Sequence, residues 1–256
     1  MSNEGFYDFH THTVFSDGGM IPAGLMQRAI VRGCLGLAIT DHVDSSNLEW
    51  ALENLLKFVD ELGQEWHPGT VPGGETTTAP LNPPGAPARD KNWHLPLIPG
   101  VELTSIPPRK IAALAEKARS TGAKWVVVHG ETIMEPVAPG TNRAAIEAKV
   151  DLLSHPGLIT PEDAARAAEL GVHLEITSHK GHSMANGWVA QRARESGAKL
   201  LLNTDCHISA EILDAKQRRA IAFGAGLTAE EVDQIWENGR RIIARHGSIH
   251  INPVSP

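Results

Sequence analysis

The sequence predicts a single α/β domain in which parallel strands and helices alternate and close into a barrel. Two observations indicate this class. Short apolar, β-branched runs recur along the 256 residues, and a helical pattern follows each one. Histidines and acidic residues also stand directly after nearly every run. Repeated units of this kind form either a barrel or an open doubly wound sheet, and the second observation separates the two.

Seven runs are predicted to be strands. The first is GFYDF, the fourth is KWVVV and the last is KLLLN. Their approximate ranges are 5–9, 35–40, 97–101, 124–128, 149–153, 172–176 and 199–203.

Helices are expected between the strands and after the last one. Their approximate ranges are 22–32, 46–62, 108–121, 141–147, 161–170, 184–196, 209–222 and 229–245. The fifth opens with a capping threonine, a proline and two acids in Thr160-Pro161-Glu162-Asp163. Glycines at the ends of several others, such as Gly33 and Gly171, are typical helix stops.

The residues after the strands favour the barrel. They are His10 and His12 after the first, Asp41 and His42 after the second, Glu102 after the third, His129 after the fourth, His155 after the fifth, and Asp205 and His207 after the seventh. In a parallel barrel all these positions meet at the carboxyl-terminal face, where active sites are built.

Six histidines in register with three acids predict a metal centre. Imidazole nitrogens and carboxylate oxygens are the ligands of Zn²⁺ at about 2.0–2.2 Å. In the spacing His10-x-His12, both rings point to the same side of an extended chain, so both can hold one ion. One such histidine alone would more often be a structural residue or a general base. The pattern leaves zinc, manganese and iron open.

The ordered set resembles the PHP family, named for polymerases and histidinol phosphatases. The matching segments are Asp8-Phe9-His10-Thr11-His12, Ser16-Asp17-Gly18, Thr40-Asp41-His42, Pro99-Gly100-Val101-Glu102, Val128-His129, Ser154-His155-Pro156 and Thr204-Asp205-Cys206-His207. The resemblance runs from the first strand to the seventh. It implies a distorted TIM-like (β/α)7 barrel with a two- or three-metal centre that hydrolyses phosphate esters.

The resemblance also implies how the ligands are grouped. One ion would be held by His10, His12, Glu102 and Asp205; Glu102 would bridge to a second ion on His129 and His155; Asp17, His42 and His207 would hold a third. Cys206 lies between two ligands on extended chain, so its side chain should point away from the metals and pack in the core.

A cluster of divalent ions at these residues would indicate a mechanism of hydrolysis. Such ions lower the pKa of bound water, generate hydroxide near neutral pH and neutralise the phosphoryl oxygens. The leaving group would be stabilised by the third ion or protonated through water near Asp205 or His207, which are therefore the candidate catalytic residues.

Substrate contacts are predicted in the basic loop after the sixth strand. Its candidates are His179, Lys180 and His182, because the loop lies at the catalytic face. Arg109 and Arg143 are further candidates; for each arginine, a solvated residue at the start of a helix is an equally good interpretation.

Residues 63–96 predict an insertion within one domain that spans 1–256. The segment holds 7 of the 17 prolines and shows no periodicity. It joins a helix to a strand, which places it on the barrel face opposite the chemistry. A subunit contact through Trp66 and Trp93 is one role for it, although the sequence carries no signal for the oligomeric state.

Composition excludes several classes of protein. The net charge of −7 argues against a general nucleic-acid-binding surface. No apolar run approaches the ~20 residues that span a bilayer, so no membrane partner and a cytoplasmic location are expected. Two cysteines cannot form a disulfide framework, in keeping with that compartment.

These observations predict a metal-dependent phosphoesterase acting on a small phosphomonoester or phosphodiester. A metal-dependent amidohydrolase is the alternative enzyme, disfavoured because His129 stands where that class places a carboxylated lysine. A non-catalytic or proofreading module of a polymerase assembly is the third hypothesis. Dinucleotide-binding, P-loop and serine-hydrolase motifs are missing from the strand-to-helix turns.

Overall fold

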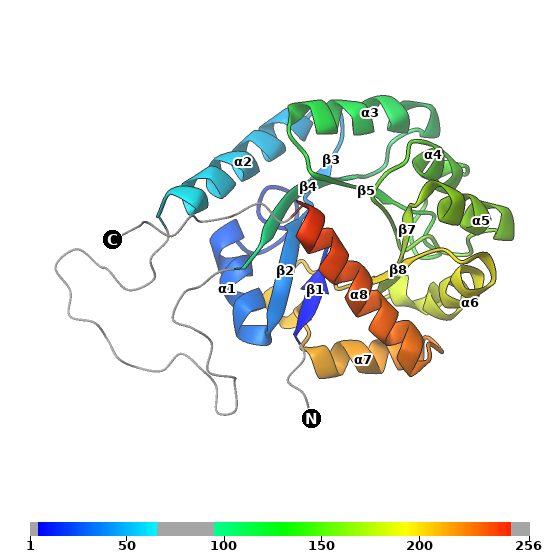
Figure 1. The fold of residues 1–256 in the computed structure, drawn as a ribbon. Coiled ribbons are helices and arrows are strands. Elements are labelled where there is room, and N and C mark those ends of the chain that lie inside the picture. Colours follow the sequence, from blue (N-terminus) through cyan, green and yellow to red (C-terminus); the bar gives the residue numbers. More distant parts are fainter. Residues whose placement is uncertain (1–4, 66–94, 247–256) are drawn as a thin grey trace.

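The chain forms an α/β TIM-like barrel, as predicted, in a computed structural model that describes residues 5–65 and 95–246 (Figure 1). All strand pairs are parallel, in the order β1-β2-β4-β5-β6-β7-β8. The strands are β1 (Phe6–Asp8), β2 (Cys34–Ile39), β4 (Leu97–Leu103), β5 (Trp125–His129), β6 (Leu152–Ser154), β7 (His173–Thr177) and β8 (Leu200–Asn203). The two-residue strand β3 (His42–Val43) pairs with the end of β4.

Helices surround the sheet (Figure 1). They are α1 (Pro22–Arg32), α2 (Leu48–Glu65), α3 (Pro108–Thr121), α4 (Thr141–Glu147), α5 (Pro161–Leu170), α6 (Asn186–Ser196), α7 (Ala215–Gly224) and α8 (Ala229–His246), with short 3₁₀ helices η1 (His182–Ala185) and η2 (Ser209–Glu211). The Thr160 cap works as the sequence predicts, because its side chain accepts a hydrogen bond from the Asp163 amide at 3.1 Å. None of the helices within the described ranges is long and apolar enough to cross a membrane.

Several boundaries differ from the sequence prediction, most of them by one to three residues, and three of the differences have a clear local cause. The helix expected over 209–222 is divided into η2 and α7, because Asp214 caps a new start: its carboxylate accepts from the Gln217 amide at 2.9 Å. The helix expected from 184 begins at Asn186, after η1. The strand expected over 149–153 begins at Leu152, because Lys149 turns the chain with a φ of 52°.

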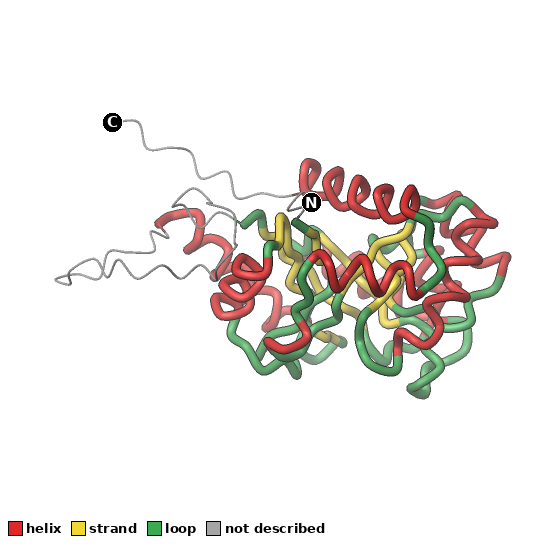
Figure 2. The backbone as a smooth tube through the Cα atoms, turned by 90° about the horizontal axis from the view of Figure 1, so that it is seen from below, coloured by secondary structure: helices red, strands yellow, loops and turns green. Residues whose placement is uncertain are grey.

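Helix α8 covers the amino-terminal end of the barrel. Ile242 belongs to the buried cluster inside the sheet with Phe9, Trp125 and Leu201. Figure 2 shows this long helix along one edge of the molecule, with the loops that follow the strands at the opposite edge. The barrel is therefore closed by packing at one end, and the carboxyl ends of its strands are left for the site.

Backbone hydrogen bonds link the segment after β8 to the segment after β1. The His12 amide donates to the Cys206 carbonyl at 3.0 Å, and the Asp205 amide donates to the His10 carbonyl at 2.9 Å. Predicted ligands that are almost 200 positions apart in the sequence thus lie side by side.

The insertion predicted over 63–96 lies mostly outside the described residues. Helix α2 continues to Glu65, and β4 begins at Leu97. The proposed contacts of Trp66 and Trp93 belong to the part that is not described, so they stay a prediction.

Candidate metal centre

The nine predicted ligands converge at the carboxyl ends of the strands. His10, His12 and Glu102 are fully buried, and Asp205, His129 and His155 are nearly so. His42 and His207 are half-buried, while Asp17 lies at the rim with 61% of its side chain exposed. The site therefore has a buried floor and a solvent-exposed rim.

Four of the ligands form the floor as one group. The Nε2 atom of His10 lies 3.2 Å from Oε1 of Glu102 and 3.5 Å from Oδ1 of Asp205. The Nε2 atom of His12 lies 3.0 Å from the same oxygen of Asp205. His10, His12 and Glu102 bring ligand atoms within 4.8 Å of one another, which is close enough for one ion.

Glu102 also belongs to a second group. Its Oε1 atom lies 3.8 Å from Nδ1 of His129 and 3.9 Å from Nε2 of His155. Its Oε2 atom lies 2.7 Å from Nδ1 of His42. Glu102 therefore stands between the groups, while its role as a bridging ligand stays a prediction.

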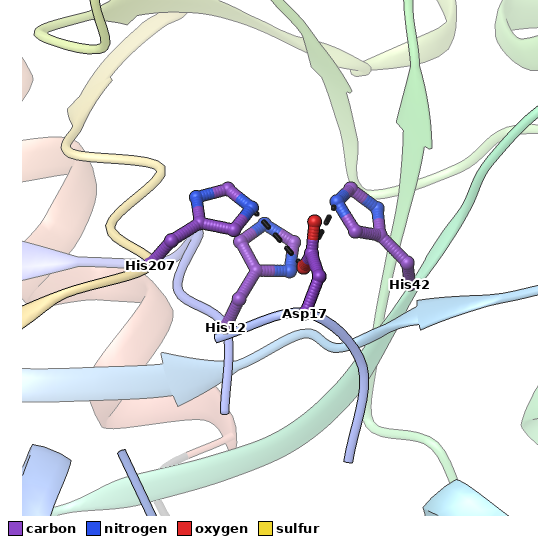
Figure 3. Close-up of side chains that lie close together, drawn as sticks. All are labelled: His12, Asp17, His42 and His207. Atoms are coloured by element: carbon purple, nitrogen blue, oxygen red, sulfur yellow. Dashed lines mark ion pairs between the residues drawn. The ribbon is translucent and has the colours of Figure 1, made fainter. Parts of the chain in front are cut away.

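The third group gathers at the rim. Oδ1 of Asp17 lies 3.2 Å from Nε2 of His207 and 3.6 Å from Nε2 of His42, and the side chain of His12 joins them (Figure 3). These three histidines come from the segment after β1, from β3 and from the segment after β8, so the group exists only in the folded barrel.

Asp41 follows β2 but braces the loop that carries Asp17. Its carboxylate accepts hydrogen bonds from the Thr13 amide at 2.7 Å, the Thr13 hydroxyl at 2.8 Å and the Ser16 hydroxyl at 2.7 Å. With its oxygens used in this way, Asp41 supports the loop rather than a metal.

The buried histidines and carboxylates shift one another's pKa values strongly. Burial lowers the pKa of His10, but the carboxylates of Glu175, Glu102 and Asp205 outweigh burial and raise the pKa well above its usual range. Burial would raise the pKa of Glu102, yet His10 and His42 hold it well below. The pKa of Asp205 is raised well above its usual range by burial, even though His10 opposes the shift.

The unsatisfied nitrogens fit a cation. Within the described ranges, His10 Nε2 and the Nδ1 atoms of His12, His129 and His155 are buried without a hydrogen-bond partner. Burial lowers the pKa of both His12 and His155 well below the usual value, so these two rings are neutral. A neutral imidazole with a free lone pair can bind a metal ion, and a buried polar atom without a partner is otherwise costly.

A pocket of about 620 Å³ opens above this floor. Asp17, His42, His129, Asp205 and His207 line it, so both candidate catalytic residues face the open space. The pKa of His207 is raised to about 9: burial lowers it, but the hydrogen bond to Asp17 and the charge of Asp205 outweigh burial.

Of the predicted substrate contacts, only His179 and His182 line the pocket. The ring of His182 stacks on His155 at a centroid distance of 4.2 Å, and burial lowers its pKa to about 4, so it is neutral. Lys180 and Arg109 are exposed and outside the lining. Arg143 pairs with Asp163 instead. For these three cationic residues a substrate role stays a prediction.

Two carboxylates at the site were missed by the sequence reasoning. Glu175 lies in β7 with Oε1 2.8 Å from Nδ1 of His10, and Glu135 lies with Oε2 3.2 Å from Nε2 of His129. Glu175 carried a signal, because an acid between two apolar residues of a predicted strand is costly to bury unless it has a partner. Glu135, on an irregular loop, carried none.

The fold and this cluster define a class: a TIM-like barrel with a candidate metal centre at its carboxyl-terminal face. No protein-family model matches the chain. The chain belongs to the family of the uncharacterized protein MJ1295 of Methanocaldococcus jannaschii, to which it is 42% identical over 228 residues, covering 89% of this chain and 93% of that protein.

Other likenesses are weaker. The probable phosphatase Shewana3_2794 of Shewanella sp. (strain ANA-3) is 38% identical over 95 residues, covering 29% of this chain and 38% of that protein. A chain in the cryo-EM structure of archaeal ribonuclease P with mature tRNA aligns with a TM-score of 0.65 at 14% identity, covering 97% of this chain and 95% of that one.

Histidinol phosphate phosphatase (HisK) from Lactococcus lactis, complexed with zinc, L-histidinol and phosphate, aligns with a TM-score of 0.54 at 16% identity, covering 87% of this chain and 94% of that one. A Xaa-Pro dipeptidase has the same score at 17% identity, covering 96% and 77%. At these identities the structures show the fold alone, which is an α/β TIM-like barrel.

Proposed function

We propose that this protein is a metal-dependent phosphoesterase of the PHP type, which hydrolyses a small phosphomonoester or phosphodiester at a two- or three-ion centre. The observation that carries the proposal is the position of Glu102. Its two oxygens face ligands of all three groups, from His10 and His155 on one side to His42 on the other. Such a shared carboxylate suits adjacent cations and has no evident use without them.

Nine side chains would hold the ions. The first group is His10, His12, Glu102 and Asp205; the second adds His129 and His155 to Glu102; the third is Asp17, His42 and His207. When bound, zinc, manganese or iron ions at these positions would supply Lewis acidity and an activated water.

The surrounding residues would bind and orient the phosphate ester. His179 and His182 lie in the pocket lining beside Asp205, where their ring nitrogens can donate to phosphoryl oxygens. Asp205 and His207 line the same space, so a water held beside them could pass a proton to the leaving group. Phosphate recognition by imidazole and metal, rather than by Lys180, Arg109 or Arg143, is the arrangement that this pocket favours.

The names of the relatives support phosphate esters without deciding the substrate. Two partial relatives are named probable phosphatases, and a structural neighbour is a histidinol phosphate phosphatase. Dipeptidase and amidohydrolase neighbours share the fold at a similar TM-score, so an amide substrate is the alternative. Fold alone does not choose between these reactions.

Release of phosphate from a panel of phosphomonoesters and diesters tests the proposal. The panel is run with Zn²⁺, Mn²⁺ and Fe²⁺ in turn, beside a panel of dipeptides and N-acyl amino acids. E102Q should abolish turnover, whereas E53Q, on the exposed face of α2, should not change it. Amide cleavage with no phosphate release would establish the alternative, and inactivity on both panels would favour the non-catalytic module.

A further inference from the structure

We propose that Glu175 is a positioning residue that locks two predicted metal ligands, His10 and His155, into their ligating arrangement, and that Asn203 holds Glu175 in turn. This inference rests on the metal centre of the proposed function. It does not depend on which bond the centre hydrolyses.

Glu175 is completely buried in β7, and both of its oxygens accept hydrogen bonds. Oε1 accepts hydrogen bonds from Nδ1 of His10 at 2.8 Å and from Nδ2 of Asn203 at 2.9 Å. Oε2 accepts from the backbone amide of His155 at 3.0 Å. One carboxylate thus joins the ends of β1, β6 and β8.

The bond to His10 selects the tautomer that can bind a metal. Because Nδ1 lies against Glu175 and donates to it, Nε2 is the nitrogen that gives up its proton when His10 binds a cation. That atom points at Glu102, 3.2 Å away, and is buried without a hydrogen-bond partner. A partner that fixes the ring and tautomer of a ligating histidine raises its basicity toward the metal.

The hydrogen bond to the His155 amide stabilises a backbone conformation that is rarely populated. His155 has a φ of 23°, which residues with a Cβ rarely adopt. Its amide is fixed by Oε2 of Glu175, and the chain turns sharply enough for the ring to point back toward Glu102 and Asp205. The strained turn and the ring direction therefore depend on the same carboxylate.

Asn203 completes the network across the seam between β8 and β1. Its Oδ1 accepts from the Phe9 amide at 2.8 Å while its Nδ2 donates to Glu175. Asn203 and Phe9 are both buried, and Phe9 directly precedes His10. The position of the first ligand is thus coupled to that of Glu175 through the backbone as well as through its ring.

The variant E175Q tests the role with the smallest change in shape. Glutamine has a single acceptor oxygen, so its amide hydrogens must face either the His10 Nδ1–H or the His155 N–H. The measurement is Zn²⁺ affinity by competition with a chromophoric chelator, together with the number of ions bound at saturation. We expect affinity to fall about 10- to 100-fold while the ion count at saturation stays that of the wild type.

The matched control is N238A. Asn238 is also buried and donates to the Leu200 carbonyl at 3.0 Å, at the opposite end of β8 from the site. The N238A variant should therefore bind Zn²⁺ as the wild type does. Unchanged affinity in folded E175Q would overturn the proposal. Loss of a whole ion at saturating Zn²⁺ would also overturn it, since Glu175 would then be a ligand itself.

If E175Q does not fold, N203A carries the test, because it removes a support of Glu175 and leaves the carboxylate in place. Weaker Zn²⁺ binding in N203A supports the role, and wild-type binding refutes it. A second readout is the slowly exchanging Nδ1–H proton of His10 in the NMR spectrum of the Zn²⁺-loaded protein. Its presence is expected in the wild type and its loss in E175Q. These results stand even if the wild type hydrolyses no phosphate ester, so the two proposals can fail separately.

Discussion

Replacing Arg218 should destabilise the whole barrel, because this side chain neutralises a buried charge close to the candidate metal centre. Arg218 is 1% exposed and pairs with the carboxylate of Asp8 in β1. Its guanidinium also donates to the carbonyls of Tyr7, Leu202 and Leu213 at 3.1–3.2 Å and lies 4.0 Å from the ring centre of Phe6.

The magnitude follows from the burial of both partners. In R218M, Asp8 keeps only its hydrogen bonds from the Thr204 amide at 3.1 Å and hydroxyl at 2.5 Å. Removing one partner of a buried pair costs about 3–5 kcal/mol, mostly because the other charge is left unpaired. Against a typical total of about 5–15 kcal/mol this is a large loss. It corresponds to a Tm lower by roughly 6–20 °C for a chain of this length.

Urea unfolding followed by circular dichroism, with the metals removed, measures the loss directly. R240M is the control, because Arg240 makes its ion pair with Glu237 at the exposed surface, so its stability should stay near that of the wild type. In D8N/R218M the unpaired charge is gone, so part of the loss should be recovered. A loss below about 1 kcal/mol in R218M, the scale of an exposed pair, would refute the reasoning.

Four further outcomes are expected. Chelation should lower the Tm measured by calorimetry, because an ion at a free concentration of 100 times its Kd stabilises the fold by about 2.7 kcal/mol. An unchanged Tm would contradict a metal centre. D17N should lose the exposed third ion and keep the buried ones, as counted by elemental analysis, whereas full loss would mean that the groups are not separate. Burial lowers the pKa of His173 below its usual 6.5. As the pH falls, the unfolded chain therefore takes up a proton on this ring before the folded protein does, and the free energy of unfolding decreases. The fall in unfolding free energy from about pH 7.5 to about pH 5.5 should therefore be smaller in H173Q than in the wild type, and an equal fall would show that His173 is not involved. Burial raises the pKa of Cys206, whose side chain packs in a core cluster, so a thiol reagent should label it only as fast as the protein unfolds; mass spectrometry locates the label, and rapid labelling of the folded protein would contradict this packing.

Local patterns predicted most of the fold. Apolar runs and capping signals act over a few residues, which is why the α5 cap at Thr160 and the alternation of strands and helices agree with the structure. The split of the helix expected over 209–222 was missed, although Asp214 and Gln217 carry the capping pattern that causes it. Here a local signal was present but was outweighed by the continuous helical pattern around it.

The convergence of the candidate metal ligands was predictable for a topological reason. Parallel strands of a barrel end at the same face, so residues that follow them in sequence must meet in space. His10 and Asp205 therefore come together without any contact being known beforehand. The basic loop did not follow this rule, because loop direction decides that His182 turns into the pocket while Lys180 is exposed.

The sequence by itself determined the barrel class and the residues that can bind metals, since both follow from periodicity and from where each strand ends. Only the tertiary structure decided which carboxylate serves which purpose. Glu102 stands between ligand groups, Glu175 orients His10, Asp41 braces a loop, and Asp8 neutralises Arg218. The physical reason is that a carboxylate's role depends on the donors it meets, and these donors come from strands brought together only when the barrel closes.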